Sequence, residues 1–384
     1  MGEHSTFDVA VIGAGVFGAW TAWHLAKRGQ RVVLLEAYGP GHNRASSGGE
    51  TRIIRMSYGP DEIYTRWSQR SLQQWKELFA ATGQRLFLQT GVLWIAGAGD
   101  PYLGASIANL ARANVKHEVM GRKELEARYP QVNFEEVDGG LLETESGVLL
   151  ARRAVNCVVE NARERGVELR IAQIAQPRSS GNLTSVETRS GERISAGQFV
   201  FACGPWLGKV FPEILGPRIF PTRQEVFFFG SPAGDARFAS PALPTWLFQR
   251  DEVYGMPDIE SRGLKVALDR HGERVDPDTQ SRLPTREAME WARSYVAKRF
   301  PALKDTPITE TRVCQYENTS NGDFLIDRHP ELSNVWLAGG GSGHGFKHGP
   351  AFGEYTAGAV LGEGQAEPRF SLGSKASQQK RAVH

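Results

Sequence analysis

Apolar and polar positions along the chain follow two periods, one typical of helices and one typical of strands. Helical spacing predicts helices over 19–28, 61–81, 104–114, 122–128, 151–165, 286–300 and 351–361. Strand patterns occupy 8–12, 31–35, 86–96, 167–171, 185–202, much of 219–268 and a run that begins at Val335. Because strand–turn–helix units stand at the beginning, middle and end of the chain, with strand-rich blocks between them, we predict two interleaved domains.

The first strand–turn–helix unit carries a dinucleotide-binding motif. Gly13 allows a tight turn, Gly15 lets the backbone approach a pyrophosphate, and Gly18 lets the helix pack close to the strand. The N–H groups and the positive end of that helix then face the phosphates. Glu36 ends the second strand, where its carboxylate can accept hydrogen bonds from an adenosine ribose. An ADP-containing dinucleotide is therefore predicted, and the motif alone leaves FAD and NAD open.

Charge and composition exclude several other functions. A net charge of +2 over 384 residues leaves no electrostatic footprint for nucleic acid. No apolar run approaches the ~18 residues of a membrane span, and the first apolar stretch is the nucleotide-binding strand itself rather than a signal peptide. The three cysteines are odd in number and widely spaced, which indicates neither a disulfide framework nor a metal cluster. We therefore expect a cytoplasmic protein without metal, membrane or nucleic-acid partners.

The segment after Glu36 is rich in glycine and serine and ends in two arginines, Arg52 and Arg55. Beside a nucleotide site, such a loop can wrap phosphates or ribityl hydroxyls. The alternative is a solvated loop whose arginines form surface ion pairs. The residue pattern does not decide between these two interpretations.

Five motifs occur in a fixed order along the chain. They are 13–18, Glu-Thr-Arg-Ile-Ile-Arg at 50–55, Gly-Leu-Lys at 263–265, Val-Cys-Gln-Tyr at 313–316 and Gly-Ser-Gly-His-Gly-Phe-Lys at 341–347. In these motifs the chain resembles the family of monomeric sarcosine oxidase and N-methyltryptophan oxidase. Those enzymes are FAD-dependent amine oxidases of the D-amino acid oxidase superfamily. The resemblance extends to about residue 365 and implies that the dinucleotide is FAD.

The resemblance also implies how the flavin is held. Cys314 aligns with the cysteine that forms a thioether to the flavin 8α-methyl group, although a lone cysteine is otherwise more often a small buried hydrophobe. Arg52 falls near the flavin in the same comparison. The remaining cofactor contacts that the resemblance implies are Ala37, Ser46, Thr51, Ile174, Gly204, Trp206, Gly341, Gly343, Gly345, Phe346 and Lys347.

A second set of residues matches the catalytic positions of the family. Arg55 and Lys347 match the pair that binds the substrate carboxylate, a role that suits a planar guanidinium and an ammonium. Lys265 matches the lysine that promotes the reaction with oxygen, where a cation stabilises the developing superoxide. Tyr316 matches a tyrosine of the same pocket. His344 lies in the glycine-rich turn near the flavin ring, where a structural histidine bonded to the backbone is the alternative.

One departure from the family pattern concerns the substrate. Asp269 stands where sarcosine oxidase has a pocket histidine. An aspartate beside the substrate amine would favour the protonated amine, which cannot donate a hydride. Alternatively, Asp269 contacts a second cationic or hydroxyl group of another substrate, or it points away and His271 takes the site. The expected reaction class does not depend on this replacement of histidine by aspartate, but the identity of the substrate stays open.

The sequence therefore predicts an α/β (α+β) flavoprotein with a Rossmann-like FAD domain and a smaller substrate domain of antiparallel sheet and helices. The FAD domain would take 1–85, 150–218 and 320–365, the substrate domain 86–149 and 219–319, and a loose tail 366–384. The expected activity is oxidation of an amino acid with a secondary amine, with O2 reduced to H2O2 by a monomer. The rivals are a dehydrogenase of the same fold that serves a quinone or electron-transfer protein, and a non-catalytic flavin-binding protein.

Overall fold

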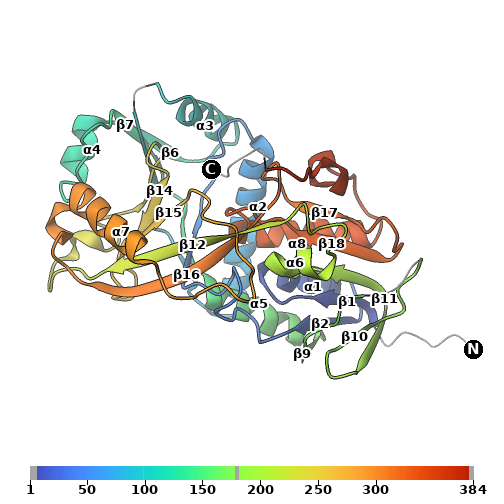
Figure 1. Cartoon of the computed structure of the whole chain (residues 1–384). Coiled ribbons are helices and arrows are strands. Elements are labelled where there is room, and N and C mark those ends of the chain that lie inside the picture. Colours follow the sequence, from blue (N-terminus) through green and yellow to red (C-terminus); the bar gives the residue numbers. More distant parts are fainter. Residues whose placement is uncertain (1–6, 98, 178–180, 380–384) are drawn as a thin grey trace, which may run out of the picture.

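A computed structural model describes residues 7–97, 99–177 and 181–379, and Figure 1 shows two sheet-based halves side by side. The first half is built on a seven-stranded sheet in the order β17-β18-β11-β1-β2-β9, with β10 paired to β11. Its strands are β1 (Phe7–Ile12), β2 (Val32–Glu36), β9 (Glu168–Ile171), β10 (Ser185–Glu187), β11 (Arg193–Phe201), β17 (Leu325–Arg328) and β18 (Val335–Gly339). Strands β9, β2, β1, β11 and β18 run parallel, so their carboxyl ends meet at one edge.

Helices cover this parallel sheet. They are α1 (Val16–Lys27), α2 (Glu62–Ala81), α5 (Ala151–Glu164) and α8 (Gly349–Val360). Helix α1 is apolar nearly all round and is buried from Val16 to Leu25, because α5 and α8 both pack against it. The Phe17 ring stacks on that of Phe352 with centroids 3.7 Å apart. Helix α1 is therefore held firmly behind the turn that precedes it.

The second half is built on an eight-stranded mixed sheet in the order β16-β12-β15-β14-β13-β5-β7-β6. These strands are β5 (Val92–Ala96), β6 (His117–Gly121), β7 (Gly139–Glu143), β12 (Phe220–Phe229), β13 (Thr245–Phe248), β14 (Val253–Met256), β15 (Leu264–Leu268) and β16 (Ile308–Asn318). Helices of this half are α3 (Pro101–Arg112), α4 (Arg122–Arg128) and α7 (Arg286–Arg299). The pairing of β13 with β5 is parallel, which makes the sheet mixed rather than purely antiparallel.

A small third sheet joins the two halves. Strand β8 (Gly147–Leu150) pairs with both β3 (Thr51–Ile54) and β4 (Phe87–Leu88). Short helical segments complete the fold: α6 (Leu207–Val210), η1 (Gly204–Trp206), η2 (Ala236–Phe238), η3 (Pro301–Leu303), η4 (Phe346–His348), η5 (Pro368–Phe370) and η6 (Leu372–Ser374). The predicted fold class, a Rossmann-like sheet interleaved with a second, largely antiparallel sheet and helices, is confirmed.

The prediction of a loose tail from residue 366 is wrong for the described part of that segment. Phe370 is fully buried, and its ring meets that of Trp67 edge-on at 5.1 Å. Lys375 Nζ donates to Asn321 Oδ1 at 3.0 Å and to the Arg369 carbonyl at 2.7 Å. An aromatic side chain and a lysine thus anchor a stretch that looks polar in sequence. Residues 380–384 of the predicted tail and 1–6 of the predicted FAD domain lie outside the described residues.

Two searches of the described residues bear on membrane and metal binding. None of their helices combines the length and the apolar character that crossing a bilayer requires. In the same residues, His, Cys, Asp and Glu side chains form no group of three or more that could hold a metal ion.

Candidate active site

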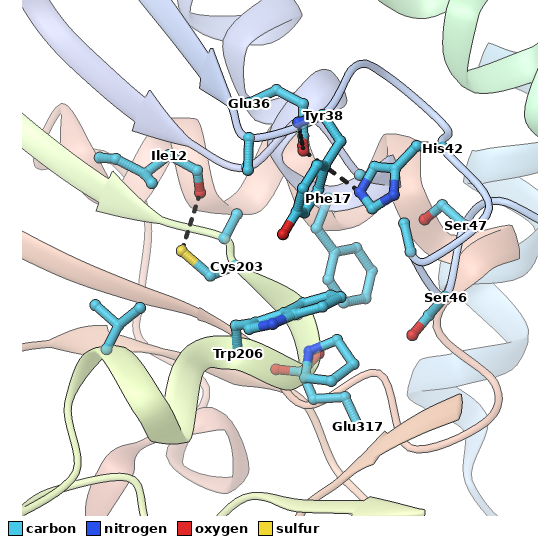
Figure 2. A pocket seen from close by; sticks show the side chains of 18 of the residues that line it. Ile12, Phe17, Glu36, Tyr38, His42, Ser46, Ser47, Cys203, Trp206 and Glu317 are labelled. Carbon is cyan, nitrogen blue, oxygen red and sulfur yellow. Dashed lines mark hydrogen bonds and ion pairs between the residues drawn. The ribbon is translucent and has the colours of Figure 1, made fainter. Parts of the chain in front are cut away.

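A cavity of about 370 Å³ lies at the carboxyl ends of the parallel strands, between the two halves of the chain (Figure 2). Open parallel sheets bind ligands at this edge. The predicted cofactor residues in its wall are Gly13, Gly15, Glu36, Ala37, Ser46, Arg52, Ile174, Gly204, Trp206, Cys314, Gly341, Gly343, Gly345 and Phe346. Three predicted cofactor residues, Gly18, Thr51 and Lys347, lie outside this wall.

The turn between β1 and α1 shapes the nucleotide end of the cavity. Gly13 has a φ of +106°, and a Cβ on it would overlap the carbonyl oxygen of Ala202. A Cβ on Gly18 would in turn overlap the carbonyl oxygen of Gly13. Glycine at both positions therefore lets α1 begin directly behind the strand. Gly15 is the N-cap residue of α1, so the start of the helix lies in the cavity wall, where the Val16 N–H donates to Ser47 Oγ at 3.1 Å.

Glu36 lies in the wall beside this turn. Its Oε2 accepts a hydrogen bond from the Ala14 N–H at 2.8 Å, and Oε1 lies 3.4 Å from His42 Nε2. Figure 2 shows Glu36 and His42 on one side of the cavity and Trp206 across from them. The carboxylate thus fixes the turn and remains at the position where an adenosine ribose is expected.

The chemistry of the cavity wall fits an FAD molecule. A helix N-terminus and a carboxylate stand at one end, which suits the ADP part of the cofactor. Ser46 Oγ is buried in the wall and, among the described residues, has no hydrogen-bond partner. Buried hydroxyls are rarely left unpaired, so a polar group of a bound cofactor would satisfy this oxygen.

A second, smaller cavity of about 70 Å³ adjoins the first. Both walls include Arg52, Cys314, Tyr316, Gly343 and Phe346, which therefore stand at the junction. The smaller cavity adds Arg55, Asp269, His344 and Lys347 from the predicted catalytic set. The fold therefore brings the predicted cofactor and substrate residues to adjoining spaces, although they come from distant segments.

Cys314 lies at the junction on strand β16. Arg52 Nη2 donates to its sulfur at 3.3 Å and to the Ser46 carbonyl at 2.6 Å. A fixed guanidinium therefore stands next to the thiol group. Of the two interpretations that the sequence left open for Arg52, the structure shows the buried one, because the arginine bonds inside the wall rather than on the surface.

Lys265 lies behind the junction, on strand β15, and is 2% exposed. Its Nζ donates to the Thr51 carbonyl at 3.2 Å and to Thr51 Oγ1 at 3.3 Å. Burial and, to a smaller extent, the nearby Arg52 charge together lower the pKa of this lysine to about 7. Thr51 thus holds Lys265 in place, and its predicted contact with the cofactor stays a prediction.

Arg55 and Lys347 stand in the wall of the smaller cavity. The guanidinium carbon of Arg55 lies 4.4 Å from the ring centroid of Tyr58 and 4.7 Å from that of Trp94. Lys347 Nζ donates to the Tyr58 hydroxyl at 2.8 Å. Burial, followed by repulsion from Arg55, holds the pKa of Lys347 well below its usual range. An incoming carboxylate would relieve that repulsion, so both groups suit an anionic ligand.

Two histidines extend this network behind Lys347. The Tyr58 hydroxyl lies 3.1 Å from His344 Nδ1 and 2.7 Å from His348 Nε2. His344 Nε2 lies 3.0 Å from the Gly322 carbonyl, and its ring stacks on that of Phe324. His344 is therefore tied to the backbone while it lies in the wall of the smaller cavity, and its position near the flavin ring stays a prediction.

Asp269 follows strand β15 and lies in the wall of the smaller cavity. Its Oδ1 accepts a hydrogen bond from the Tyr316 hydroxyl at 3.0 Å. Burial raises the pKa of Asp269, an effect that the Arg55 charge partly opposes. His271 is turned toward Gln379, whose Nε2 lies 2.6 Å from its Nδ1. Asp269, and not His271, therefore lines the cavity.

Sequence reasoning missed several residues that line or support the site. Tyr58 and His348 were not predicted, because nothing in their local pattern marks them as neighbours of Lys347. Glu317 lies in the cofactor cavity wall, and burial raises the pKa of its carboxyl group to about 7. It lies two residues past Gln315 in β16, an edge strand whose polar sequence does not display a strand pattern.

Comparisons of this chain with known proteins all indicate the same family. The model of the family described as "DAO: FAD dependent oxidoreductase" matches residues 8–359. Human peroxisomal sarcosine oxidase is 32% identical over 360 residues, which cover 92% of this chain and 91% of that protein. Monomeric sarcosine oxidase from Bacillus sp. (strain NS-129) is 30% identical over 376 residues, 95% of each chain.

Solved structures agree on the fold. L-proline dehydrogenase from P. horikoshii superposes with a TM-score of 0.83 at 24% identity, covering 97% of this chain and 98% of that one. At this identity the likeness concerns the fold alone. The family match and the full-length relatives place this chain among sarcosine oxidase-like enzymes that act on CH–NH bonds. The chain belongs to the DAO family of FAD-dependent oxidoreductases.

Proposed function

We propose that this protein is an oxidase of small amino acids that carry a secondary amine, either N-substituted or cyclic. The observation that carries this proposal is the pair of adjoining cavities. The larger one fits FAD, and the adjoining smaller one has Arg55 and Lys347 in its wall. A volume of about 70 Å³ favours a small substrate. The sarcosine oxidases that the chain resembles support the same substrate class.

The chain's own residues bind and orient the substrate. Arg55 pairs with the carboxylate through its planar fork, while Lys347 adds a second positive charge. Tyr58 holds Lys347 by its hydroxyl, which limits the freedom of the ammonium group. This anchoring turns the amine end of the substrate toward the junction of the two cavities. When bound, FAD supplies the two-electron acceptor for the hydride on the carbon next to nitrogen, and the imine product hydrolyses in water.

Lys265 acts in the half-reaction in which O2 is reduced to H2O2. Its ammonium group is held by Thr51 behind the junction, where a cation favours the first electron transfer to O2. The two electrons and two protons removed from the substrate leave as H2O2. This lysine supports an oxidase over a dehydrogenase that passes electrons to a quinone or to another protein.

Cys314 is proposed to carry the flavin through a thioether. Its sulfur lies at the junction of both cavities with the Arg52 guanidinium next to it. Such a link would replace the S–H bond of Cys314 and one C–H bond of the flavin methyl group by a C–S bond, and O2 would accept the two electrons and two protons released. Acid-precipitated protein should therefore stay yellow, whereas Cys314→Ser protein should release all its flavin into the supernatant. Release from both would refute the covalent link.

The oxidase proposal is tested with the purified holoenzyme under anaerobic conditions. The visible spectrum is followed while N-methyl, cyclic and N-carboxymethyl amino acids are added, and the sample is then opened to air. We expect one class to bleach the flavin and air to restore it quickly with release of peroxide. Slow restoration would instead establish the dehydrogenase, and no bleaching by any amine would refute the substrate class.

A further inference from the structure

The charges of the substrate cavity are asymmetric. Among its lining residues in the described part of the chain, Arg52, Arg55 and Lys347 are basic and Asp269 is the acid. Arg55 and Lys347 account for the carboxylate of an amino acid, whose negative charge favours the charged form of the lysine. The same substrate brings a second charged group, because its nitrogen is protonated in neutral water. Asp269 is the wall residue whose charge complements that nitrogen.

Asp269 is held in a fixed orientation. Its backbone N–H donates to the Glu252 carbonyl at 2.7 Å, which continues the β14–β15 pairing. Its Oδ1 accepts the Tyr316 hydroxyl at 3.0 Å, and Tyr316 itself lies at the junction with the cofactor cavity. The backbone bond fixes the residue and the Tyr316 hydroxyl fixes one carboxylate oxygen, so the side chain can exchange a proton without rearranging the wall. Its second oxygen, Oδ2, is the atom that we assign to this exchange.

A protonated amine has no lone pair, and the lone pair is what allows the neighbouring carbon to release a hydride. We propose that Asp269 is the base that takes the proton from the substrate nitrogen when the amino acid enters the cavity. This inference rests on the proposed function. In the step, one N–H bond of the ammonium breaks and one O–H bond forms on Oδ2. No electrons are transferred, and the pair changes from two charged groups to two neutral ones.

The surroundings favour that neutral pair. Burial raises the pKa of the Asp269 carboxyl group, while Arg55, the Tyr316 hydrogen bond, Lys347 and His271 each lower it. Tyr254 and Tyr102 also lie in its electrostatic field. Burial acts on the ammonium in the opposite sense, and the cations of the wall repel it. An aspartate in a solvated wall would favour the protonated amine, but desolvation disfavours both charged groups here, so the neutral pair replaces the ion pair and the proton moves toward the carboxylate.

Asp269→Asn removes the base and keeps the size of the side chain. Stopped-flow reduction of the holoenzyme flavin by sarcosine and by L-proline would be measured from pH 6 to pH 9 without oxygen. In the wild type, the apparent Kd should change less than about threefold across this range. In the variant, only the neutral amine is productive, so the apparent Kd should rise about tenfold for each pH unit below the pKa of the amine. The limiting reduction rate at saturation should stay within a few-fold.

Glu273→Gln is the matched control, because Glu273 is an exposed acid four residues along the same segment. This variant should keep the wild-type pH profile. Methoxyacetate, which has a carboxylate and no amine, reports the carboxylate site through its effect on the flavin spectrum. It should bind Asp269→Asn and wild type within about threefold. Asp269→Glu, which restores a carboxylate, should recover the flat profile.

The outcomes separate this inference from the function on which it rests. If no amine reduces the wild-type flavin, the proposed function fails. If amines do reduce it but Asp269→Asn keeps the flat pH profile, the function stands and the role of Asp269 is overturned. Loss of methoxyacetate binding in Asp269→Asn would also overturn it, because Asp269 would then support the carboxylate site. A steep profile in Asp269→Glu would have the same consequence.

Discussion

The two cavities of this protein are built by different means. The cofactor cavity is bordered by turns after parallel strands, where glycines let backbone segments approach one another more closely than a side chain would allow. The substrate cavity is shaped by charged and aromatic side chains that converge from separate segments. We therefore expect the cofactor cavity to be sensitive to atoms added at its glycines. The substrate cavity should instead be sensitive to the loss of its charged side chains. The following predictions test that difference, from the largest expected effect to the smallest.

Gly13→Ala should abolish flavin binding. The added methyl would overlap the Ala202 carbonyl oxygen, and a φ of +106° adds strain of about 1–2 kcal/mol for a residue with a side chain. The measurement is the ratio of flavin to protein absorbance after purification. Gly29→Ala is the control, because Gly29 has a φ of +80° and an added Cβ there meets nothing within 4 Å. Equal flavin content in Gly13→Ala and Gly29→Ala would contradict the expectation that atoms added at this turn disturb the cofactor cavity.

Arg55→Met should weaken substrate binding and leave flavin content unchanged. Methionine keeps contact with the rings of Tyr58 and Trp94 but leaves the substrate carboxylate without its partner. Such a loss costs roughly 4 kcal/mol, so the apparent Kd should rise about 10³-fold. Anaerobic titration of flavin reduction measures it. Arg237→Met, at an exposed arginine paired with Asp235, serves as the control and should titrate like the wild type.

Lys265→Met should separate the two half-reactions. The rate of flavin reduction by the amine should stay within a few-fold, because the lysine is not in the wall of the substrate cavity. The rate of reoxidation by O2 should fall about 10²- to 10³-fold, the usual effect of losing one stabilising group. Stopped-flow mixing of reduced enzyme with oxygenated buffer measures this rate. Equal slowing of both half-reactions would remove Lys265 from the oxygen reaction.

The reoxidation rate should also depend on pH in the wild type. Burial, then Arg52, lowers the pKa of Lys265 to about 7, so its positive charge is present below this pH and lost above it. Reoxidation should therefore slow as the pH rises from 6 to 9 and approach the rate of Lys265→Met. The variant itself should show a flat profile over this range. A wild-type rate that increases with pH would contradict the assigned charge.

Glu317→Gln should have the smallest effect, a gain of a few degrees in Tm at pH 8. Burial raises the pKa of Glu317 from 4.5 to about 7. The folded state therefore holds this proton more tightly than the unfolded state, and stability is lost as the pH rises from about 4.5 to 7. Glutamine avoids that loss, which is about 3 kcal/mol at most. Thermal unfolding of both proteins at pH 5 and pH 8 measures it, and no difference is expected at pH 5.

Sequence patterns were sufficient for the parts of the fold that have a local signal. Helix α4 begins and ends where the spacing of its apolar residues predicts, and the β1–α1 turn follows from its glycines. Helix α3 begins three residues earlier than predicted, because Asp100 caps it and accepts the Leu103 N–H at 2.9 Å. Strands β3 and β16 were missed. Both are rich in polar residues, because they border the cavities instead of a continuous apolar core.

The candidate site likewise has one part that local sequence patterns predict and one part that they do not. The cofactor positions followed from motifs whose spacing has a backbone reason, and most of them line one cavity. The network around Lys347 could not be derived, because Tyr58 and His348 reach it only through the packing of η4 against distant segments. Contacts that depend on such packing leave no periodic signal along the chain. Neither does the hydrogen bond between Tyr316 and Asp269, which joins β16 to the end of β15.

The anchored carboxyl-terminal segment has a practical consequence for attaching the enzyme to an electrode or a fusion partner. Lys375 donates a hydrogen bond to Asn321, and the carbonyl of the next residue, Gly322, contacts His344. Gln379 contacts His271, two residues after Asp269 in the substrate cavity wall. A load applied through this end would pull on the substrate side of the molecule. Attachment before β1 would load the parallel sheet instead, far along the chain from those contacts. The amino-terminal side is therefore the better anchoring point.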